Sequence, residues 1–97
     1  MKILLIFESI LKNILGKEQI NISGDYSTIN DVVNFIYDYC KKIGKIDQLK
    51  TSIGDKRDFY DKIVIILNDI EISALDGKET TLNDEDQIVF IPITHGG

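Results

Sequence analysis

Three short apolar runs constrain the fold of this chain more than any other feature. They are "ILLIF" at 3–7, "IVIIL" at 63–67 and "IVFI" at 88–91. Runs of this length, rich in β-branched residues and bounded by polar ones, are typical of strands, and we expect strands at 62–68 and 87–93. Residues of both parities are apolar in each run, so both faces of the resulting sheet carry hydrophobic side chains. The sheet therefore needs a cover on each face.

One helix is predicted between Ser27 and Gly44. Thr28 and Asp31 have the spacing of a capping box, Lys41 and Lys42 suit the negative end of a helix dipole, and glycine favours a left-handed stop. The apolar residues of this segment recur at spacings of three and four and so form one stripe: Ile29, Val32, Val33, Ile36, Cys40 and Ile43.

The remaining elements complete an α+β pattern. Alternation of Ile20 and Ile22 with polar residues predicts a strand at 17–23, and a brief strand is expected between Asp69 and Asp86, near a turn at 75–80. The opening run at 2–7 is interpreted as a strand, although it also fits a helical period when combined with the apolar residues of 10–15. The order strand, strand, helix, strand, short strand, strand favours a mixed sheet with one helix on one face.

Only one helix is then available for two apolar faces. In one interpretation the loop from Ile46 to Tyr60 folds over the second face, because monomers seldom leave large apolar patches bare. In the other interpretation that face docks another protein.

Composition limits the class of protein. With 97 residues, 43% of them hydrophobic, the chain can form one core and hence one domain. A net charge of -5 disfavours nucleic acid as a partner, and the seven basic against four acidic residues of 41–62 are too small an excess to change this. Cys40 is the only cysteine and lies on the apolar stripe, which predicts a buried, inert thiol in a cytoplasmic protein. Because no apolar run reaches about 18 residues, we expect no membrane span.

The chain ends in "FIPITHGG" at 90–97. Pro92 cannot donate to a sheet ladder, so pairing is expected to stop near Ile91, which divides the chain into a domain at 1–92 and an extended tail at 93–97. Thr94 to Gly97 would span about 13 Å. Glycines without Cβ atoms can enter a narrow channel on another protein and leave the terminal carboxylate unshielded, although two glycines alone are a weak motif and favour an ordinary frayed end.

The segment at 62–97 resembles the ubiquitin-related modifier family, the eukaryotic and archaeal members of the β-grasp sulfur carriers. The resemblance rests on Asn68-Asp69 after an apolar strand, on Leu82, Asp84 and Asp86 before the last strand, and on the ending from Thr94 to Gly97. The stretch "FESILKNILGKEQINI" at 7–22 also resembles the first hairpin of the family. The resemblance implies a ubiquitin-like β-grasp fold with about five strands and one main helix, and it favours the strand at 2–7.

The resemblance also implies that the protein is a substrate rather than an enzyme, with no cofactor of its own. In the family an activating enzyme uses ATP and magnesium to adenylate the terminal glycine, here Gly97, and sulfur then replaces AMP to give a thiocarboxylate. Thr94, His95 and Gly96 would be recognised by that enzyme; a lone histidine lacks the partners that catalysis needs. The thiocarboxylate can donate sulfur, through a tRNA thiolation enzyme, to the wobble uridine of certain tRNAs, or its carbonyl can be joined to lysines of target proteins.

Two other functions stay open. Pro92 replaces a small polar residue common in the family, and "FIPITHGG" partly resembles the Phe-Pro-Pro stretch of the molybdopterin synthase small subunit, whereas Asn68-Asp69 and His95 favour the tRNA-thiolation relatives. The chain could instead be a non-covalent interaction domain whose glycines are incidental. Seven acidic residues and one basic residue at 68–87 fit a solvated surface or steering toward a basic partner.

Overall fold

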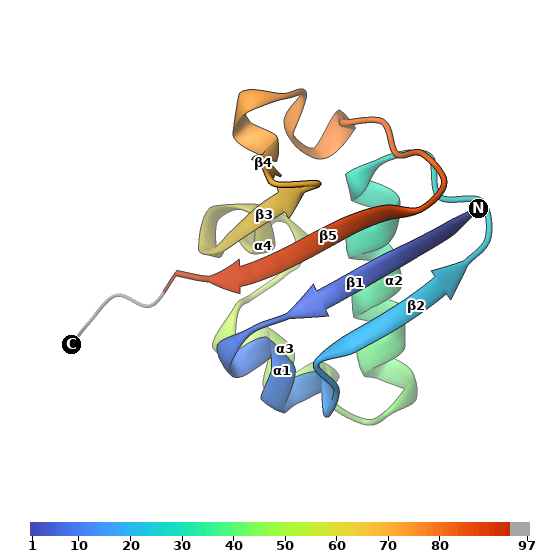
Figure 1. Cartoon of the computed structure of the whole chain (residues 1–97). Coiled ribbons are helices and arrows are strands. Elements are labelled where there is room, and N and C mark those ends of the chain that lie inside the picture. The colour runs from blue at the N-terminus through green and yellow to red at the C-terminus, as the bar shows by residue number, and fades with distance from the viewer. Residues whose placement is uncertain (94–97) are drawn as a thin grey trace.

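A computed structural model of the chain describes residues 1–93. The sheet lies in front of a layer of helices in Figure 1. The elements are β1 (Lys2–Phe7), α1 (Ser9–Leu15), β2 (Gln19–Ser23), α2 (Ile29–Lys42), α3 (Ile46–Ser52), α4 (Lys56–Lys62), β3 (Ile63–Leu67), β4 (Ile70–Glu71), two 3-10 turns, η1 (Ile72–Ala74) and η2 (Gly77–Glu79), and β5 (Asp86–Pro92).

The five strands form one mixed sheet in the order β2-β1-β5-β3-β4. The central pair, β1 and β5, is parallel, and the other neighbours are antiparallel. The last strand of the chain thus lies in the middle of the sheet, held by a neighbour on each side. The predicted α+β class and the mixed five-stranded sheet are confirmed.

The main helix, α2, is also confirmed. Its N-terminus has the predicted capping box, and the Asp31 carboxylate accepts hydrogen bonds from the backbone N–H groups of Thr28 and Ser27, at 3.1 and 2.8 Å. The predicted stripe is buried except at Ile43, which follows the helix and is 38% exposed. With 14 residues α2 is too short to cross a bilayer, and in the described chain no other helix is long and apolar enough to do so.

A short helix that the sequence analysis missed, α1, separates the first two strands. Leu11, Ile14 and Leu15 are buried on one side of it, and Gly16 ends it in the left-handed conformation at φ 71°. The apolar period that competed with the opening strand is therefore a real helix, but it begins only at Ser9, after β1 has ended. As a consequence β2 starts at Gln19 rather than at Lys17.

The prediction that 46–60 is a loop over the second sheet face is wrong. This segment forms α3 and most of α4, which lie with α2 on one side of the sheet (Figure 1). Phe59 of α4 is fully buried, and its ring centroid lies 6.0 Å from that of Tyr37 in α2 and 5.9 Å from that of Phe90 in β5. The Tyr37 hydroxyl donates to the backbone oxygen of Gly54 at 2.7 Å and so ties the α3–α4 connection to α2. These three helices therefore cover the same face.

Candidate functional site

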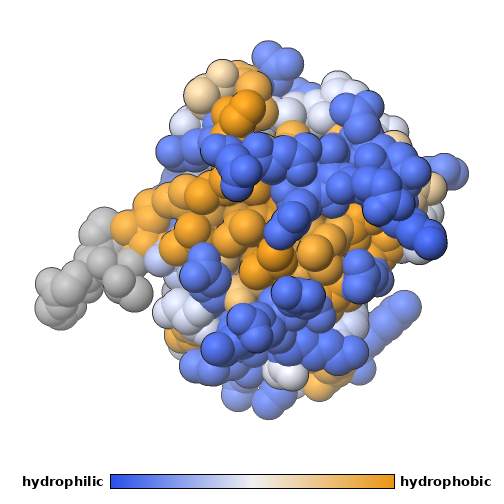
Figure 2. Space-filling view, viewed as in Figure 1, coloured by the Kyte–Doolittle hydropathy of each residue, from blue (hydrophilic) through white to orange (hydrophobic). Residues whose placement is uncertain are grey.

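The sheet face opposite the helices carries a continuous set of aliphatic side chains, which we call the open face. Val89 of β5 lies between Ile6 of β1 and Ile66 of β3, and Ile91 lies opposite Val64. Figure 2 shows apolar atoms running across this face toward the end of the chain. The open face consists of Leu4, Ile6, Val64, Ile66, Val89 and Ile91, all of them partly exposed.

The open face has a polar border. Gln19, Asn21 and Gln87 lie opposite open-face residues on the β1 side, and Glu71 lies opposite Ile66 on the β3 side. All four are exposed. An apolar centre with a polar rim is the usual anatomy of a protein interface, and contiguous apolar surface of this kind mostly marks interaction sites. Of the two predicted covers for the second face, a docked protein is the one that the fold leaves available.

The open face continues into the C-terminal segment. Ile93 has the same parity as Ile91, is 45% exposed, and donates its backbone N–H to the oxygen of Lys62 at 2.9 Å. Pairing therefore extends beyond the point near Ile91 at which it was predicted to stop. Thr94 follows directly, so that a partner seated on the open face would be next to the start of the predicted tail.

The position of Pro92 explains why it does not end the ladder. Along an antiparallel pair of strands, residue pairs that are hydrogen bonded alternate with pairs that are not. Because Ile93 is hydrogen bonded to Lys62, the neighbouring pair, Pro92 and Ile63, is one without hydrogen bonds. The proline nitrogen therefore points toward β1, whose last residue in register with β5 is Phe7, opposite Phe90. Proline is tolerated here because the β3–β5 ladder needs no donor at this position.

The predicted recognition residues Thr94, His95 and Gly96, and the predicted reactive residue Gly97, lie outside the described residues. Their roles stay predictions, as does the division of the chain into 1–92 and 93–97. Cys40 can be placed: it is fully buried, and burial raises the pKa of its thiol from 9.0 to about 11. The predicted burial of Cys40 is therefore confirmed, and because a buried thiol with a raised pKa is a poor nucleophile, its inertness stays the expectation.

Asn68 and Asp69, which contributed to the family resemblance, shape a turn. Both residues have positive φ, 48° and 72°, and they connect β3 to β4 as a two-residue hairpin loop. The Asn68 side chain accepts from the backbone N–H of Gln87 at 3.0 Å and donates to the Asp86 carboxylate at 2.8 Å. Asparagine is favoured because it tolerates the left-handed conformation and supplies both bonds.

The acidic residues before β5 fix the start of that strand. The 7%-exposed Asp86 also accepts from the backbone N–H of Asn83 at 2.6 Å, and Asp84 accepts from the backbone N–H of Lys2 at 2.7 Å. Leu82 is buried in the core. This part of the acidic segment is therefore structural: it positions β5, the strand that leads to the C-terminus.

One comparison with known proteins identifies a family. The family model described as "Urm1 (Ubiquitin related modifier)" matches residues 5–97. A comparison with curated protein sequences gives no significant match.

Several solved structures share the fold. The solution structure of small archaeal modifier protein 1 (SAMP1) from Methanosarcina acetivorans is 27% identical, with a TM-score of 0.73, and the match covers 99% of this chain and 96% of that one. Urm1 from Trypanosoma brucei is 19% identical, with a TM-score of 0.71 and coverage of 99% and 95%. A putative molybdopterin converting factor, subunit 1, from Pyrococcus furiosus is 16% identical, with a TM-score of 0.70 and coverage of 97% and 99%. At these identities the last two show the fold alone.

Proposed function

Because the chain belongs to the ubiquitin-related modifier family, whose members are small ubiquitin-like sulfur carriers, we propose that Gly97 is adenylated by an activating enzyme and converted to a thiocarboxylate. The observation that carries this proposal is the continuity of the open face with β5. An enzyme docked on the open face would meet the chain at Ile93, from which Thr94 to Gly97 reach about 13 Å further. That distance suits delivery of a terminal carboxylate into a recessed active site.

The chemistry requires activation because a carboxylate is a poor electrophile. A Gly97 oxygen would attack the α-phosphorus of ATP, and pyrophosphate would leave, with magnesium held by the enzyme and the nucleotide. A sulfur nucleophile supplied by the enzyme would then attack the carbonyl carbon, and AMP would leave. Gly96 and Gly97 have no Cβ atoms, so a channel can close tightly on this backbone. The chain itself would contribute position rather than catalysis.

We propose two fates for the thiocarboxylate, both of which the family resemblance implies. One is sulfur donation for 2-thiolation of the tRNA wobble uridine by a thiolation enzyme. The other is attachment of the Gly97 carbonyl to a lysine of a target protein. Loss of 2-thiouridine on deletion of the gene would support the first, and a C-terminal Gly-Gly remnant on lysines of other proteins would support the second.

Intact-mass spectrometry tests the shared step. The full chain is incubated with its activating enzyme, ATP, magnesium and a sulfur source. Replacement of one oxygen by sulfur adds about 16 Da, and a chain lacking Gly96 and Gly97 should show no such shift. The proposal is wrong if the native chain is unchanged, or if the truncated chain shifts equally.

A small-subunit role in molybdopterin synthase is the second candidate, favoured by Pro92 in "FIPITHGG". In this candidate function the terminal carboxylate is activated in the same way, but the sulfur is delivered to the larger catalytic subunit of molybdopterin synthase. Stable co-purification with a pterin-binding subunit, together with unchanged tRNA thiolation on deletion, would favour this candidate over the first. A non-covalent interaction domain, the third, predicts instead that removal of 94–97 leaves partner binding intact.

A further inference from the structure

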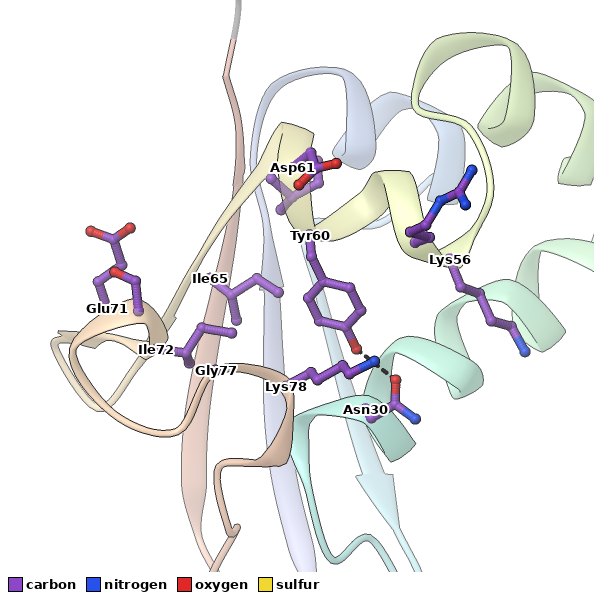
Figure 3. A pocket seen from close by; sticks show the side chains of 12 residues that line it. Asn30, Lys56, Tyr60, Asp61, Ile65, Glu71, Ile72, Gly77 and Lys78 are labelled. Atoms are coloured by element: carbon purple, nitrogen blue, oxygen red, sulfur yellow. Dashed lines mark hydrogen bonds between the residues drawn. The ribbon is translucent and has the colours of Figure 1, made fainter.

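A hollow of about 510 Å³ lies at the β3–β4 end of the sheet, among the elements of the helix side. It is bordered by α4, by the N-terminal end of α2 and by the 3-10 turns after β4 (Figure 3). Its volume is in the range of ligand-binding pockets. It shares none of the six open-face residues, although Glu71 of the polar border also lines it, and the tail proposed to carry sulfur is not needed to form it.

The side chains that line the hollow differ in character from one part of it to another. Its floor is apolar and formed by Ile63, Ile65 and Ile72, all buried. In Figure 3 the side chains of Lys78, Tyr60 and Asn30 converge at one end, whereas Asp61 and Glu71 lie away from that end. A bound ligand would therefore contact apolar side chains in the middle of the hollow, a lysine at one end and acidic side chains at the border.

A hydrogen bond fixes the two neutral side chains, Tyr60 and Asn30, that lie beside Lys78 at this end. The Tyr60 hydroxyl donates to Oδ1 of Asn30 at 2.8 Å. Because the amide oxygen is used in this way, the amide nitrogen of Asn30 is the group that can donate to an occupant. Burial, with Glu79 and Asp31 nearby, raises the pKa of Tyr60 to about 12, so the donor keeps its proton at neutral pH.

The charge around the hollow differs from that of the whole chain. Lys56 and Arg57 line this hollow and also an adjoining smaller one, to which Lys41 and Lys50 contribute. Together with Lys78, five cationic side chains border the two hollows, against four acidic ones, Asp38, Asp55, Asp61 and Glu71, so this region has a small positive balance in a chain whose net charge is -5. The basic excess at 41–62 is too small for a nucleic acid, and Asp61 and Glu71 on the rim oppose the binding of a polyphosphate. A ligand with few negative charges and an apolar part fits better.

We propose that this hollow binds a short segment of a partner protein in which an apolar side chain stands next to a carboxylate. The apolar side chain would lie on Ile65 and Ile72, and the carboxylate would accept from Lys78 and from the amide of Asn30. Because the open face is a separate surface, this partner and the activating enzyme could be bound at the same time. The hollow would then allow a partner protein to bind before the thiocarboxylate at Gly97 reacts.

The test is a titration of the isotope-labelled full chain, followed by NMR of isoleucine methyl groups. The probe is the capped peptide acetyl-Glu-Leu-Glu-Leu-amide, and its neutral match is acetyl-Gln-Leu-Gln-Leu-amide. We expect saturable shifts of the methyl signals of Ile63, Ile65 and Ile72 with the acidic peptide. The neutral peptide should bind about tenfold more weakly, because a charge-assisted hydrogen bond contributes about 1.5 kcal/mol.

Two substitutions provide the control. Lys78→Gln should weaken the acidic peptide about tenfold and leave the neutral one unchanged, whereas Lys12→Gln on α1, outside the hollow, should change neither. Equal binding of the two peptides, absence of shifts at millimolar peptide, or insensitivity to Lys78→Gln would overturn the proposal. Lys78→Gln should leave the 16 Da conversion of Gly97 intact, so failure here is distinct from failure of the proposed sulfur chemistry.

Discussion

The two faces of the sheet are built from the same kinds of side chain and have different neighbours. Ile65 and Phe90 point toward the helices and are at most 2% exposed, whereas Val64 and Val89, the residues before them, lie on the open face and are partly exposed. Hydrophobicity alone does not distinguish the two roles. The helix-covered face stabilises the fold, and we assign the open face to a partner.

The largest expected effect is on the covered face. Phe90→Ala removes a ring that stacks on Phe7 at 5.5 Å and contacts Phe59, and it should lower the free energy of unfolding by about 3–5 kcal/mol. Its matched neighbour, Val89→Thr, keeps the β-branched shape at a partly exposed position, where the hydroxyl can stay hydrated, and should cost less than about 1 kcal/mol. Urea denaturation measures both values. Similar losses for the two variants would show that the faces do not differ in their contribution to stability.

The second effect concerns docking on the open face. Val89→Thr places a hydroxyl at the centre of the open face, between Ile6 and Ile66, where a docked enzyme would have to desolvate it. We expect kcat/KM for adenylation to fall about tenfold, which corresponds to about 1.4 kcal/mol. Pyrophosphate exchange measures this, with Thr81→Val, on the loop before β5, as the control. An unchanged rate for the folded Val89→Thr protein would remove the open face from the interface.

A third effect, on stability and smaller than that of Phe90→Ala, is expected at the turn that positions β5. Asn68→Ala removes the bonds to Gln87 and Asp86 and places alanine at a φ of 48°, so we expect a loss of about 2 kcal/mol. Asn68→Gly removes the same bonds without the backbone cost and should lose about 1 kcal/mol less than Asn68→Ala. Thermal unfolding followed by circular dichroism compares the two. If the two substitutions destabilise the chain equally, the left-handed backbone conformation at position 68 does not contribute to the loss of stability.

The smallest effect is a pH dependence on the covered side. The thiol of Cys40 has its pKa raised by burial from 9.0 to about 11, so the folded chain holds this proton at a pH at which the unfolded chain has lost it. This contribution to stability is complete below pH 9 and declines as the pH rises toward 11. The urea midpoint of the native chain should therefore exceed that of Cys40→Ala by less at pH 10 than at pH 8. A difference that is constant with pH would contradict this burial effect.

Much of the fold could be predicted, because the strands and α2 have strong local signals. Apolar runs of both parities predicted a sheet with two apolar faces, and the spacing from Ile29 to Cys40, with Thr28 and Asp31, predicted the helix. The helices α1, α3 and α4 have seven residues each, which is too few for periodicity to separate them from loops. The burial of Leu49 and Phe59 that places α3 and α4 on the α2 side is a tertiary effect.

The candidate site was predictable in part. Apolar residues of both parities indicated a second face in need of a cover, but the sequence could not say whether 46–60 supplied it. The hollow was not predicted, because Asn30, Tyr60 and Lys78 come from three separate segments and have no common motif. Conversely, Asn68 and Asp86 carried the family resemblance, and their hydrogen bonds show that they position β5.

In the proposed function, the open face and the C-terminus act together in activation. Intact mass after incubation with the activating enzyme, ATP, magnesium and a sulfur source tests it most directly, on the native chain and on Val89→Thr at equal folded fraction. The account predicts a gain of about 16 Da for the native chain and about tenfold slower conversion for Val89→Thr. A native chain that gains no mass, or a variant converted at the native rate, would contradict it.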